Sequence, residues 1–528
     1  MDGFDEDQLQ YHARALRALV DRVLGEFHPR ETGEPTLVER VEQHLGENPL
    51  SLPVVTERWA PHEQADAQVA LEHWLASSAR DAEIVGTPHH ARRHQTFAEM
   101  LQFSRRDPGF VVGPPDWVHV PVSPDDTHPC VSFGIYLVAG TPPLAVLLRG
   151  PDPQTGNPFV QLEVVTADAE VARELVAELR RLAIELSPVR GQIVTLAPPD
   201  RPGGSPIAFL RRPQLTREQL VLPEETLVAV ERQVVDVAAL RDRLRGAGQH
   251  LKRGLLLYGP PGTGKTHTVR YLLGQLEGAT AVVLSGVALH QVAAACELAK
   301  RHQPSVVILE DVDLVAGDRS FGPPGSNPLL FEVLNQLDGL GDDVDVVFIL
   351  TTNRVEVLER ALAERPGRVD EAVEVGAPDA GGRERLLRLY GATAGIADLD
   401  LATTVEATEG LTATFLRELT RRAVIAATTA RPDEDPVRVQ QADLDAAVEQ
   451  LQASRAQLTR ALLGESRGIT HPPGAFAEHG FESYVGLGQR PGLIARRGAS
   501  FTSFGAAFID DGDDAAPPSP PPGWADDD

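Results

Sequence analysis

A doubly wound α/β fold with a parallel sheet is predicted for the middle of this 528-residue chain. Short β-rich runs alternate there with helical patterns, in the order LLLYG, AVVLS, SVVILED, DVVFILTTN and AVEVGAP. Such alternation is typical of parallel strands joined by helical crossovers. The first run also leads directly into a glycine-rich octapeptide and then into a helical pattern, as expected where a strand delivers a tight loop to a helix N-terminus.

The whole chain is too long for a single hydrophobic core and divides by composition. Residues 1–110 read as mostly helical, from leucines and valines near helical spacing. Short β-rich runs with one helical pattern predict a small α+β domain at 111–221, including GQIVTLA and PIAFL. The larger α/β domain is expected at 222–382 and a small helical lid domain at 383–463. The acidic, Gly/Pro/Ser-rich residues 464–528 are predicted to be disordered.

Bulk composition excludes several classes of protein. Hydrophobic residues make up 42% and charged residues 24%, as in ordinary globular proteins. The net charge of −27 argues against coating of nucleic acid or of an anionic membrane. No apolar run reaches the ~18 residues of a membrane span, and the acidic start MDGFDEDQLQ lacks the layout of a signal peptide. We therefore expect a cytoplasmic protein without membrane contact.

The strongest motif is GPPGTGKT, which lies between a buried strand and a helical pattern. Its glycines let the backbone fold round a phosphate, and the following helix adds unpaired N–H groups and its positive dipole end. Lys265 is expected to reach the β- and γ-phosphates and the Thr266 hydroxyl to ligate Mg²⁺. A chance glycine-rich turn is a negligible alternative for this octapeptide in this context. The predicted ATP-binding residues are Gly259, Pro260, Pro261, Gly262, Thr263, Gly264, Lys265, Thr266 and His267.

A second signal is SVVILEDVD, a buried strand that ends in carboxylates 45 residues after Lys265. Hydrolysis of a bound triphosphate needs one acid to hold the Mg²⁺ water shell and another to polarise the attacking water. Acids at a strand end are often only solvated loop residues. Following a phosphate-binding loop at this spacing, however, they are better interpreted as the two catalytic acids.

The motifs GPPGTGKT, ILEDVD, ILTTN and ERPGRVD, in this order and spacing, resemble the AAA ATPase family over the region from Leu222 to Ala453. The motif LEDVD resembles the corresponding motif of the subgroup that contains the mitochondrial ATPase inserting the Rieske iron–sulfur protein. By position, the resemblance gives Glu310 the Mg²⁺ role and Asp311 the water-activating role. The family usually has Asp before Glu, the reverse of this chain. Because Asp311 is one methylene shorter than the usual base, it must sit closer to the water or act through altered geometry. We expect a competent ATPase, and the sequence does not tell whether hydrolysis is fast or slow.

The same resemblance assigns residues that complete the site. Asn353 matches the polar sensor that orients the attacking water, and Arg365 and Arg368 match the paired arginine fingers that act on a neighbouring subunit's nucleotide. A guanidinium fork suits the charge that spreads over the γ-phosphate oxygens. In an arginine-rich chain the alternative is that both are surface residues. The resemblance implies a ring, most often a hexamer.

Some family features are absent or altered in the sequence. TEGLTATFLREL resembles the lid-helix start that packs near adenine, but Ala413-Thr414-Phe415 replaces Gly-Ala-Asp. The segment LSGVALHQVAAACELAKRHQPS has no aromatic residue and is too short for the usual substrate-gripping loop, so processive threading of polypeptides is not expected. The HExxH motif of the zinc-protease members is missing. The histidines of TPHHARRHQ (His89, His90 and His94) fit a metal cluster poorly, and a solvated turn is the preferred interpretation.

The leading hypothesis is an ATP-hydrolysing ring that remodels a protein partner docked on the N-terminal domains. Its cofactors are ATP and Mg²⁺. One alternative is a nucleotide-driven loader acting on nucleic acid, against which the acidity counts. Another is a weakly hydrolysing switch or scaffold, suggested by the reversed acids. The sequence identifies neither the protein substrate nor the role of residues 1–220.

Overall fold

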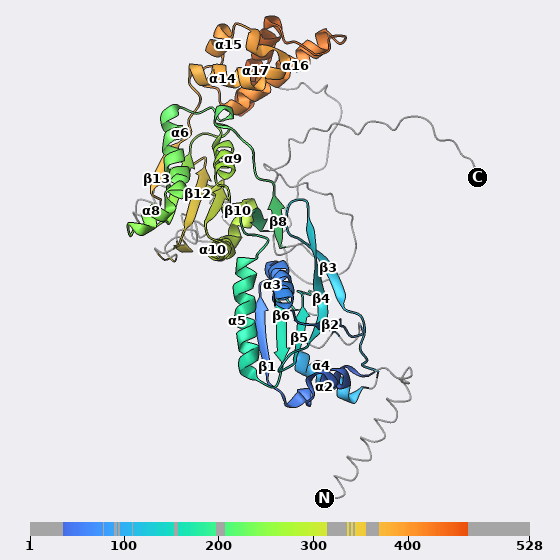
Figure 1. The fold of residues 1–528 in the computed structure, drawn as a ribbon. Helices are drawn as coiled ribbons and strands as arrows, with labels where there is room; N and C mark the ends of the chain where they lie inside the picture. The colour runs from blue at the N-terminus through green and yellow to red at the C-terminus, as the bar shows by residue number, and fades with distance from the viewer. Residues whose placement is uncertain are drawn as a thin grey trace, which may run out of the picture. The chain divides into compact units, whose positions relative to one another are not determined.

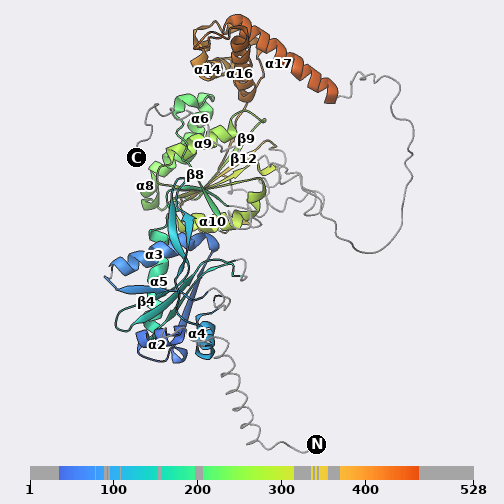
Figure 2. The ribbon, with the colours of Figure 1, turned by 90° about the vertical axis from the view of Figure 1, so that its right-hand side faces the viewer.

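The structure is a computed structural model, and it describes most of the chain between residues 35 and 462 (Figures 1 and 2). Within that span it leaves out 78, 89–91, 93–95, 108, 153–156, 197–205, 314–334, 337–338, 340, 342–343 and 355–368. The chain forms two compact units. The first runs to Leu386 and includes Gly410–Phe415; the second comprises Leu387–Glu409 and the chain from Leu416 onward. Among the helices of the described ranges, none combines the length and apolar character needed to cross a membrane.

The first unit contains an antiparallel sheet near its N-terminal end, in the strand order β1-β6-β5-β4-β2, with β3 also paired to β4. Its strands are β1 (Val54–Trp59), β2 (Ala82–Val85), β3 (Asp116–Pro121), β4 (Thr127–Val138), β5 (Leu144–Arg149) and β6 (Val160–Val165). β5 and β6 are buried at every position. Strands with near-continuous apolar runs need cover on both faces, and this sheet has it.

Helices cover the two faces of this sheet with separate cores. One core joins α3 (Gln64–Ser77) and α5 (Ala169–Glu185) to one set of strand residues. The other joins α2 (Leu37–Leu45) and α4 (Phe97–Arg106) to the alternate residues of the same strands. Along β5, for example, Val146 belongs to the first core and Leu147 to the second. The two-residue period of a strand therefore specifies a three-layer domain.

The prediction of a mostly helical region at 1–110 misses two strands in the part that the structure describes, where helices α2, α3 and α4 also lie. Residues 54–59 and 82–85 are strands at the two sides of the sheet. β1 alternates exposed and half-buried side chains, the pattern of a half-covered edge strand, and its sequence VVTERW is rich in β-favouring residues. Residues 1–34 lie outside the described part of the chain, as does the acidic tail that was predicted to be disordered.

The predicted parallel sheet is confirmed. Seven strands follow the order β13-β9-β12-β11-β10-β7-β8, and every neighbouring pair is parallel except β7 with β8. The strands are β7 (Ile193–Leu196), β8 (Ile207–Leu210), β9 (Arg253–Tyr258), β10 (Thr280–Ser285), β11 (Ser305–Glu310), β12 (Val346–Thr352) and β13 (Glu371–Glu374). Helices α9 (Lys265–Gln275) and α10 (Val292–Arg301) connect successive parallel strands, and α6 (Glu224–Glu231) precedes β9. The α/β fold class follows from this sheet.

Two of these strands differ from the expectation. GQIVTLA and PIAFL were expected in the smaller α+β domain, yet β7 pairs with β10 and extends the parallel sheet. Arg212, just after β8, donates to four carbonyl oxygens, at Gly191, Leu273, Leu276 and Ala279, over 2.6–3.0 Å. A short apolar run predicts a strand but not the sheet to which it belongs, and here the contacts of Arg212 tie the extension to the end of α9.

The second unit is helical, as predicted for the lid domain. The helices in this part of the chain are α14 (Ala380–Tyr390), α15 (Ala402–Ala407), α16 (Ala413–Ala430) and α17 (Gln441–Leu462). The first residues of α14 and of α16 belong to the first unit. In α16 the buried side chains Leu416, Leu419 and Ala423 recur at helical spacing, which gives the lid an apolar core.

One buried acid makes the N-terminal domain sensitive to pH. Asp66 on α3 is 3% exposed and accepts a hydrogen bond of 2.8 Å from the Ser187 hydroxyl. Burial raises the pKa of Asp66 to about 7, against the lowering effect of Ser187. The folded state thus binds this proton more tightly than the unfolded chain does. The free energy of unfolding therefore falls as pH rises from about 4 to about 7 and stays at its lower value above that.

We predict that Asp66→Asn stabilises the domain above pH 7, by on the order of 3 kcal/mol, with a gain that vanishes near pH 4. Asparagine keeps an oxygen to accept from Ser187 but carries no charge to bury. Thermal melts of both proteins between pH 4 and pH 8 measure the difference. Glu174→Gln, at an exposed position of α5, is the control and should give a difference that does not change with pH. A pH-independent difference for Asp66→Asn would contradict the argument.

Candidate active site

The glycine-rich loop joins β9 to α9 in a conformation that only glycine adopts readily. Gly259, Gly262 and Gly264 have φ values of 143°, 78° and 115°. A Cβ on Gly259 would lie 2.3 Å from the carbonyl oxygen of Val375. A Cβ on Gly262 would lie 2.8 Å from the Thr414 hydroxyl oxygen. The octapeptide is therefore a closely packed loop that ends at the first turn of α9.

Lys265, the first residue of α9, is 6% exposed. Its Nζ donates to the carbonyl oxygens of Gly259 and Pro260, each at 2.9 Å. Burial lowers the pKa of Lys265, while the charges of Asp311 and Asp313 act to raise it. The ammonium group is thus held at the loop with two carboxylates near it.

Glu310 is the last residue of β11 and is 3% exposed. The Thr266 hydroxyl forms a hydrogen bond with its carboxyl group, yet its Oε1 has no partner among the described residues. Burial, together with the charge of Asp311, raises the pKa of Glu310 to about 7. A buried carboxylate oxygen without a partner needs an explanation. Together with the neighbouring hydroxyl it forms an oxygen donor set of the kind that Mg²⁺ prefers, so the residues present fit that ion.

Asp311 leaves the strand with φ of 50°, in the left-handed region, which Asp tolerates better than most residues. Its backbone N–H donates to the Thr351 hydroxyl at 2.9 Å. Its Oδ1 accepts from Nδ2 of Asn353 at 3.2 Å. Burial, and then the charge of Asp313, raise the pKa of Asp311, while Lys265 and Asn353 act to lower it. The ends of β11 and β12 thus bring Asp311 and Asn353 into direct contact.

Asp313 is a member of this network that the sequence analysis did not single out. It is 7% exposed, and its Oδ1 accepts from the Thr352 hydroxyl at 2.9 Å and from the Asn353 backbone N–H at 3.0 Å. The available signal was the third acid of ILEDVD, two residues beyond Asp311. Nothing in that spacing said that it would face the end of β12.

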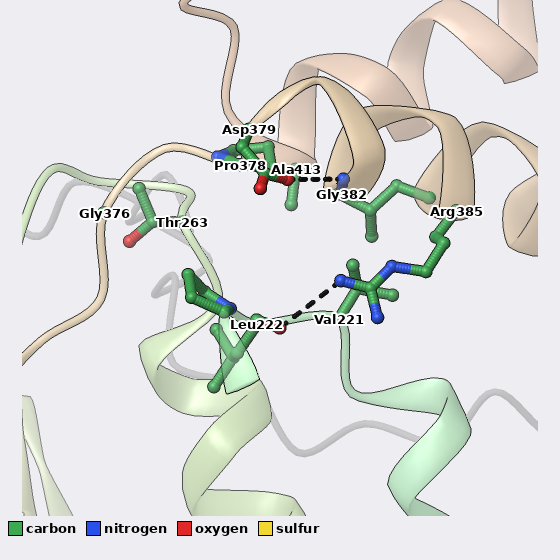
Figure 3. Close-up of a pocket in the computed structure, with 11 residues that line it drawn as sticks. Val221, Leu222, Thr263, Gly376, Pro378, Asp379, Gly382, Arg385 and Ala413 are labelled. Carbon is green, nitrogen blue, oxygen red and sulfur yellow. Dashed lines mark hydrogen bonds between the residues drawn. The ribbon is translucent and has the colours of Figure 1, made fainter. Parts of the chain in front are cut away.

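A small, mostly apolar hollow adjoins the loop through Thr263 (Figure 3). Arg385 reaches across it and donates to the carbonyl oxygen of Leu222 at 3.4 Å, and the Gly382 backbone N–H donates to Asp379 at 2.6 Å. Its lining of apolar side chains with a few polar groups is of the kind that contacts organic ligands. The residues that line it are Val221, Leu222, Pro223, Thr263, Gly376, Pro378, Asp379, Gly382, Arg385, Leu386 and Ala413.

The altered lid-helix start contacts the loop directly. The backbone N–H and the hydroxyl of Thr414 both donate to the carbonyl oxygen of Gly262, at 3.1 and 3.2 Å. Thr414 stands in the tripeptide where the sequence departs from the family pattern. The departure from the pattern therefore places a threonine hydroxyl in hydrogen-bond contact with the loop.

Not every predicted residue can be placed. Arg365 and Arg368 lie outside the described residues, as do His89, His90 and His94. His267 is half-buried in the first turn of α9, while Pro260 and Pro261 are exposed on the loop. The structure brings Lys265, Thr266, Glu310, Asp311 and Asn353 together at the carboxyl edge of the sheet, where open α/β folds hold their ligands.

Comparison with known proteins agrees with this geometry. Residues 255–377 match the model of the "ATPase family associated with various cellular activities (AAA)". The chain is 32% identical over 291 residues to the ATP-dependent zinc metalloprotease FtsH of Thermus thermophilus, covering 52% of this chain and 46% of that protein. It is 36% identical over 231 residues to FtsH 4 of Sphaerobacter thermophilus, covering 41% of this chain and 34% of that protein. The chain thus spans less than half the length of these relatives.

We predict that Gly259→Ala destabilises the domain by about 3 kcal/mol or more, because a methyl group there meets backbone as well as a strained φ. Gly248→Ala is the matched control: its φ is 73°, and a Cβ at that position meets nothing within 4 Å. The control should lose only the ~1 kcal/mol that a left-handed φ costs. Urea unfolding of the two variants measures both values. Equal losses would show that the contact with Val375 does not constrain the loop.

Proposed function

The domain at residues 255–377 makes this chain a member of the AAA ATPase family, and on that basis we propose that it binds Mg²⁺–ATP around Lys265 and hydrolyses it. The observation that carries the proposal is the buried, unpartnered oxygen of Glu310 beside Thr266, at the same sheet edge as the Asp311–Asn353 pair. Because this oxygen lies beside the Thr266 hydroxyl, the two could ligate one cation, for which we propose Mg²⁺.

In the proposed site the loop backbone and the N-terminus of α9 hold the phosphates, and Lys265 donates to them. Thr266 and Glu310 would hold Mg²⁺, which when bound neutralises charge on the phosphate oxygens. The residues around the apolar hollow beside Thr263 would contact the adenine ring. Gly259 to His267 are the proposed nucleotide-contacting residues.

For the chemical step, Asp311 is proposed to act as the general base: it accepts a hydrogen bond from the attacking water and then takes its proton. Asn353, which already donates to Asp311, would orient that water and the carboxylate together. The acid at this position is shorter than usual, so the placement of Asp311 by its neighbours matters more than for a longer side chain.

Arg365 and Arg368 are proposed to act in trans, completing a neighbouring protomer's site within a ring, most often a hexamer. This proposal rests on the ERPGRVD motif alone. A guanidinium supplied by a partner would make hydrolysis depend on assembly. Turnover per protomer should then rise with protein concentration.

We further propose that the ring remodels a protein partner held by the three-layer N-terminal domain. The names of the relatives, ATP-dependent zinc metalloproteases, support a protein substrate. The connection from β10 to α10 is a six-residue 3₁₀ turn, Gly286–Gln291, in which Val287 is 75% exposed and no aromatic is present. So short a connection favours remodelling over processive threading. A nucleic-acid loader is the second candidate, and stimulation of turnover by DNA or RNA would promote it.

We predict that Asp311→Asn keeps Mg²⁺–ATP binding but lowers turnover at least ~100-fold, because the general base is lost. Lys265→Ala should lose ATP binding itself. Steady-state phosphate release and titration with a fluorescent ATP analogue measure the two effects. Lys300→Ala, which removes only an exposed pair with Glu297, is the control. Undiminished turnover in Asp311→Asn would rule out the assignment of the base, and full binding in Lys265→Ala would rule out the site.

We predict that Thr414→Val weakens ATP binding about 3- to 10-fold, since one hydrogen bond to the loop is worth about 1 kcal/mol. Thr414→Ser keeps the hydroxyl and should bind as the unmodified protein does. The same fluorescent titration compares them. If Thr414→Val binds the analogue as tightly as the unmodified protein does, the hydroxyl contact with Gly262 has no role in nucleotide affinity.

A further inference from the structure

The turn that follows β12 is built on one carboxylate. Ladder pairing of β12 with β9 ends at Thr352, so the N–H of Asn353 lies beyond the sheet. Asp313 supplies the acceptor for that N–H and for the Thr352 hydroxyl, with the same oxygen. The Thr352 hydroxyl in turn accepts from the N–H of Arg354 at 3.0 Å. The turn that carries Asn353 is therefore shaped by Asp313.

These contacts run in a chain toward the proposed base. Asp313 holds the backbone of Asn353, and the side chain of Asn353 donates to Asp311. The hydrogen bonds that the structure gives to Asp313 come from Thr352 and Asn353, and none comes from the phosphate loop. Both donors meet a single oxygen of this buried side chain. Asp313 is thus suited to fix a backbone position, not to touch the nucleotide.

We infer that Asp313 is a positioning residue for ATP hydrolysis, which sets Asn353 against Asp311 so that the pair is aligned for the attacking water. The inference rests on the proposed ATPase function. A displacement of about 1 Å at a reacting group can cost ~100-fold in rate. The loss of one backbone anchor for Asn353 is therefore expected to act on turnover and not on affinity.

The test compares Asp313→Ala with Asp313→Asn, each alone and combined with Asn353→Ala. Asparagine keeps an oxygen that can accept both hydrogen bonds, whereas alanine keeps none. Turnover and the Kd for Mg²⁺–ATP are measured for all variants. Amide hydrogen exchange is measured on the nucleotide-free proteins. It is followed in two peptides, one that spans 346–354 and one that spans the phosphate loop at 259–266.

We expect Asp313→Ala to lower kcat 10- to 100-fold with Kd changed less than about twofold, and Asp313→Asn to stay within about threefold of the unmodified protein. In the Asn353→Ala background, Asp313→Ala should have little further effect, since the group through which it acts is gone. Exchange should quicken in the 346–354 peptide and stay unchanged in the phosphate-loop peptide.

The inference is overturned if Asp313→Ala lowers kcat by the same factor with and without Asn353. It is equally overturned if Kd changes as much as kcat and exchange in the phosphate-loop peptide changes as much as exchange in the 346–354 peptide. That result would indicate a general structural role. Hydrogen exchange separates the two proposals. If the unmodified protein does not hydrolyse ATP, the proposed function fails, while unchanged exchange in the 346–354 peptide of Asp313→Ala rejects the positioning role regardless of activity.

Discussion

The crowding of three carboxyl groups at the carboxyl edge of the parallel sheet is the constraint on which this site depends. Glu310, Asp311 and Asp313 lie there with the ammonium of Lys265, and the charges of two of these acids act directly on that lysine. A buried charge is costly unless it is paired or hydrogen-bonded. Each acid therefore has a dedicated donor from another part of the chain: the Thr266 hydroxyl for Glu310, the Asn353 amide group for Asp311, and the Thr352 hydroxyl for Asp313. One oxygen of Glu310 has no hydrogen-bond partner among the described residues.

The sheet makes this meeting possible because β9, β12 and β11 are adjacent and parallel. Their carboxyl ends must then lie at one edge, although the residues that follow them are 40 to 90 positions apart in the chain. The additional strands β7 and β8 join at the far side of β10 and do not take part in the edge chemistry. The N-terminal domain is thus connected to the parallel sheet through β7 and β8, which contribute none of the site residues described above.

The sequence predicted those parts of the fold that depend on local pattern. The glycines at 259, 262 and 264 predict a loop with positive φ values, and the apolar runs of β9, β11 and β12 predict buried strands. The neighbour with which a strand pairs is a property of the whole fold. The sequence analysis therefore placed β7 and β8 in the smaller α+β domain and did not separate β1 and β2 from the helical region around them. The role of Asp313 depends on a contact across 40 residues with the turn after β12, and no local pattern encodes such a contact.

The two adjacent acids meet different neighbours in this chain. Adjacent residues of a regular strand point to opposite faces. Glu310 still belongs to the strand and turns its longer side chain toward Thr266. At Asp311 the backbone enters the left-handed region, which breaks the alternation and allows its side chain to meet Asn353 of the neighbouring strand end. The change of backbone conformation at Asp311 thus gives the two acids different partners: Glu310, which ends the strand, meets the Thr266 hydroxyl, and Asp311, which leaves it, meets the Asn353 side chain. Asp311, the shorter acid, is held by Asn353 and the Thr351 hydroxyl, while Glu310, the longer acid, extends toward Thr266.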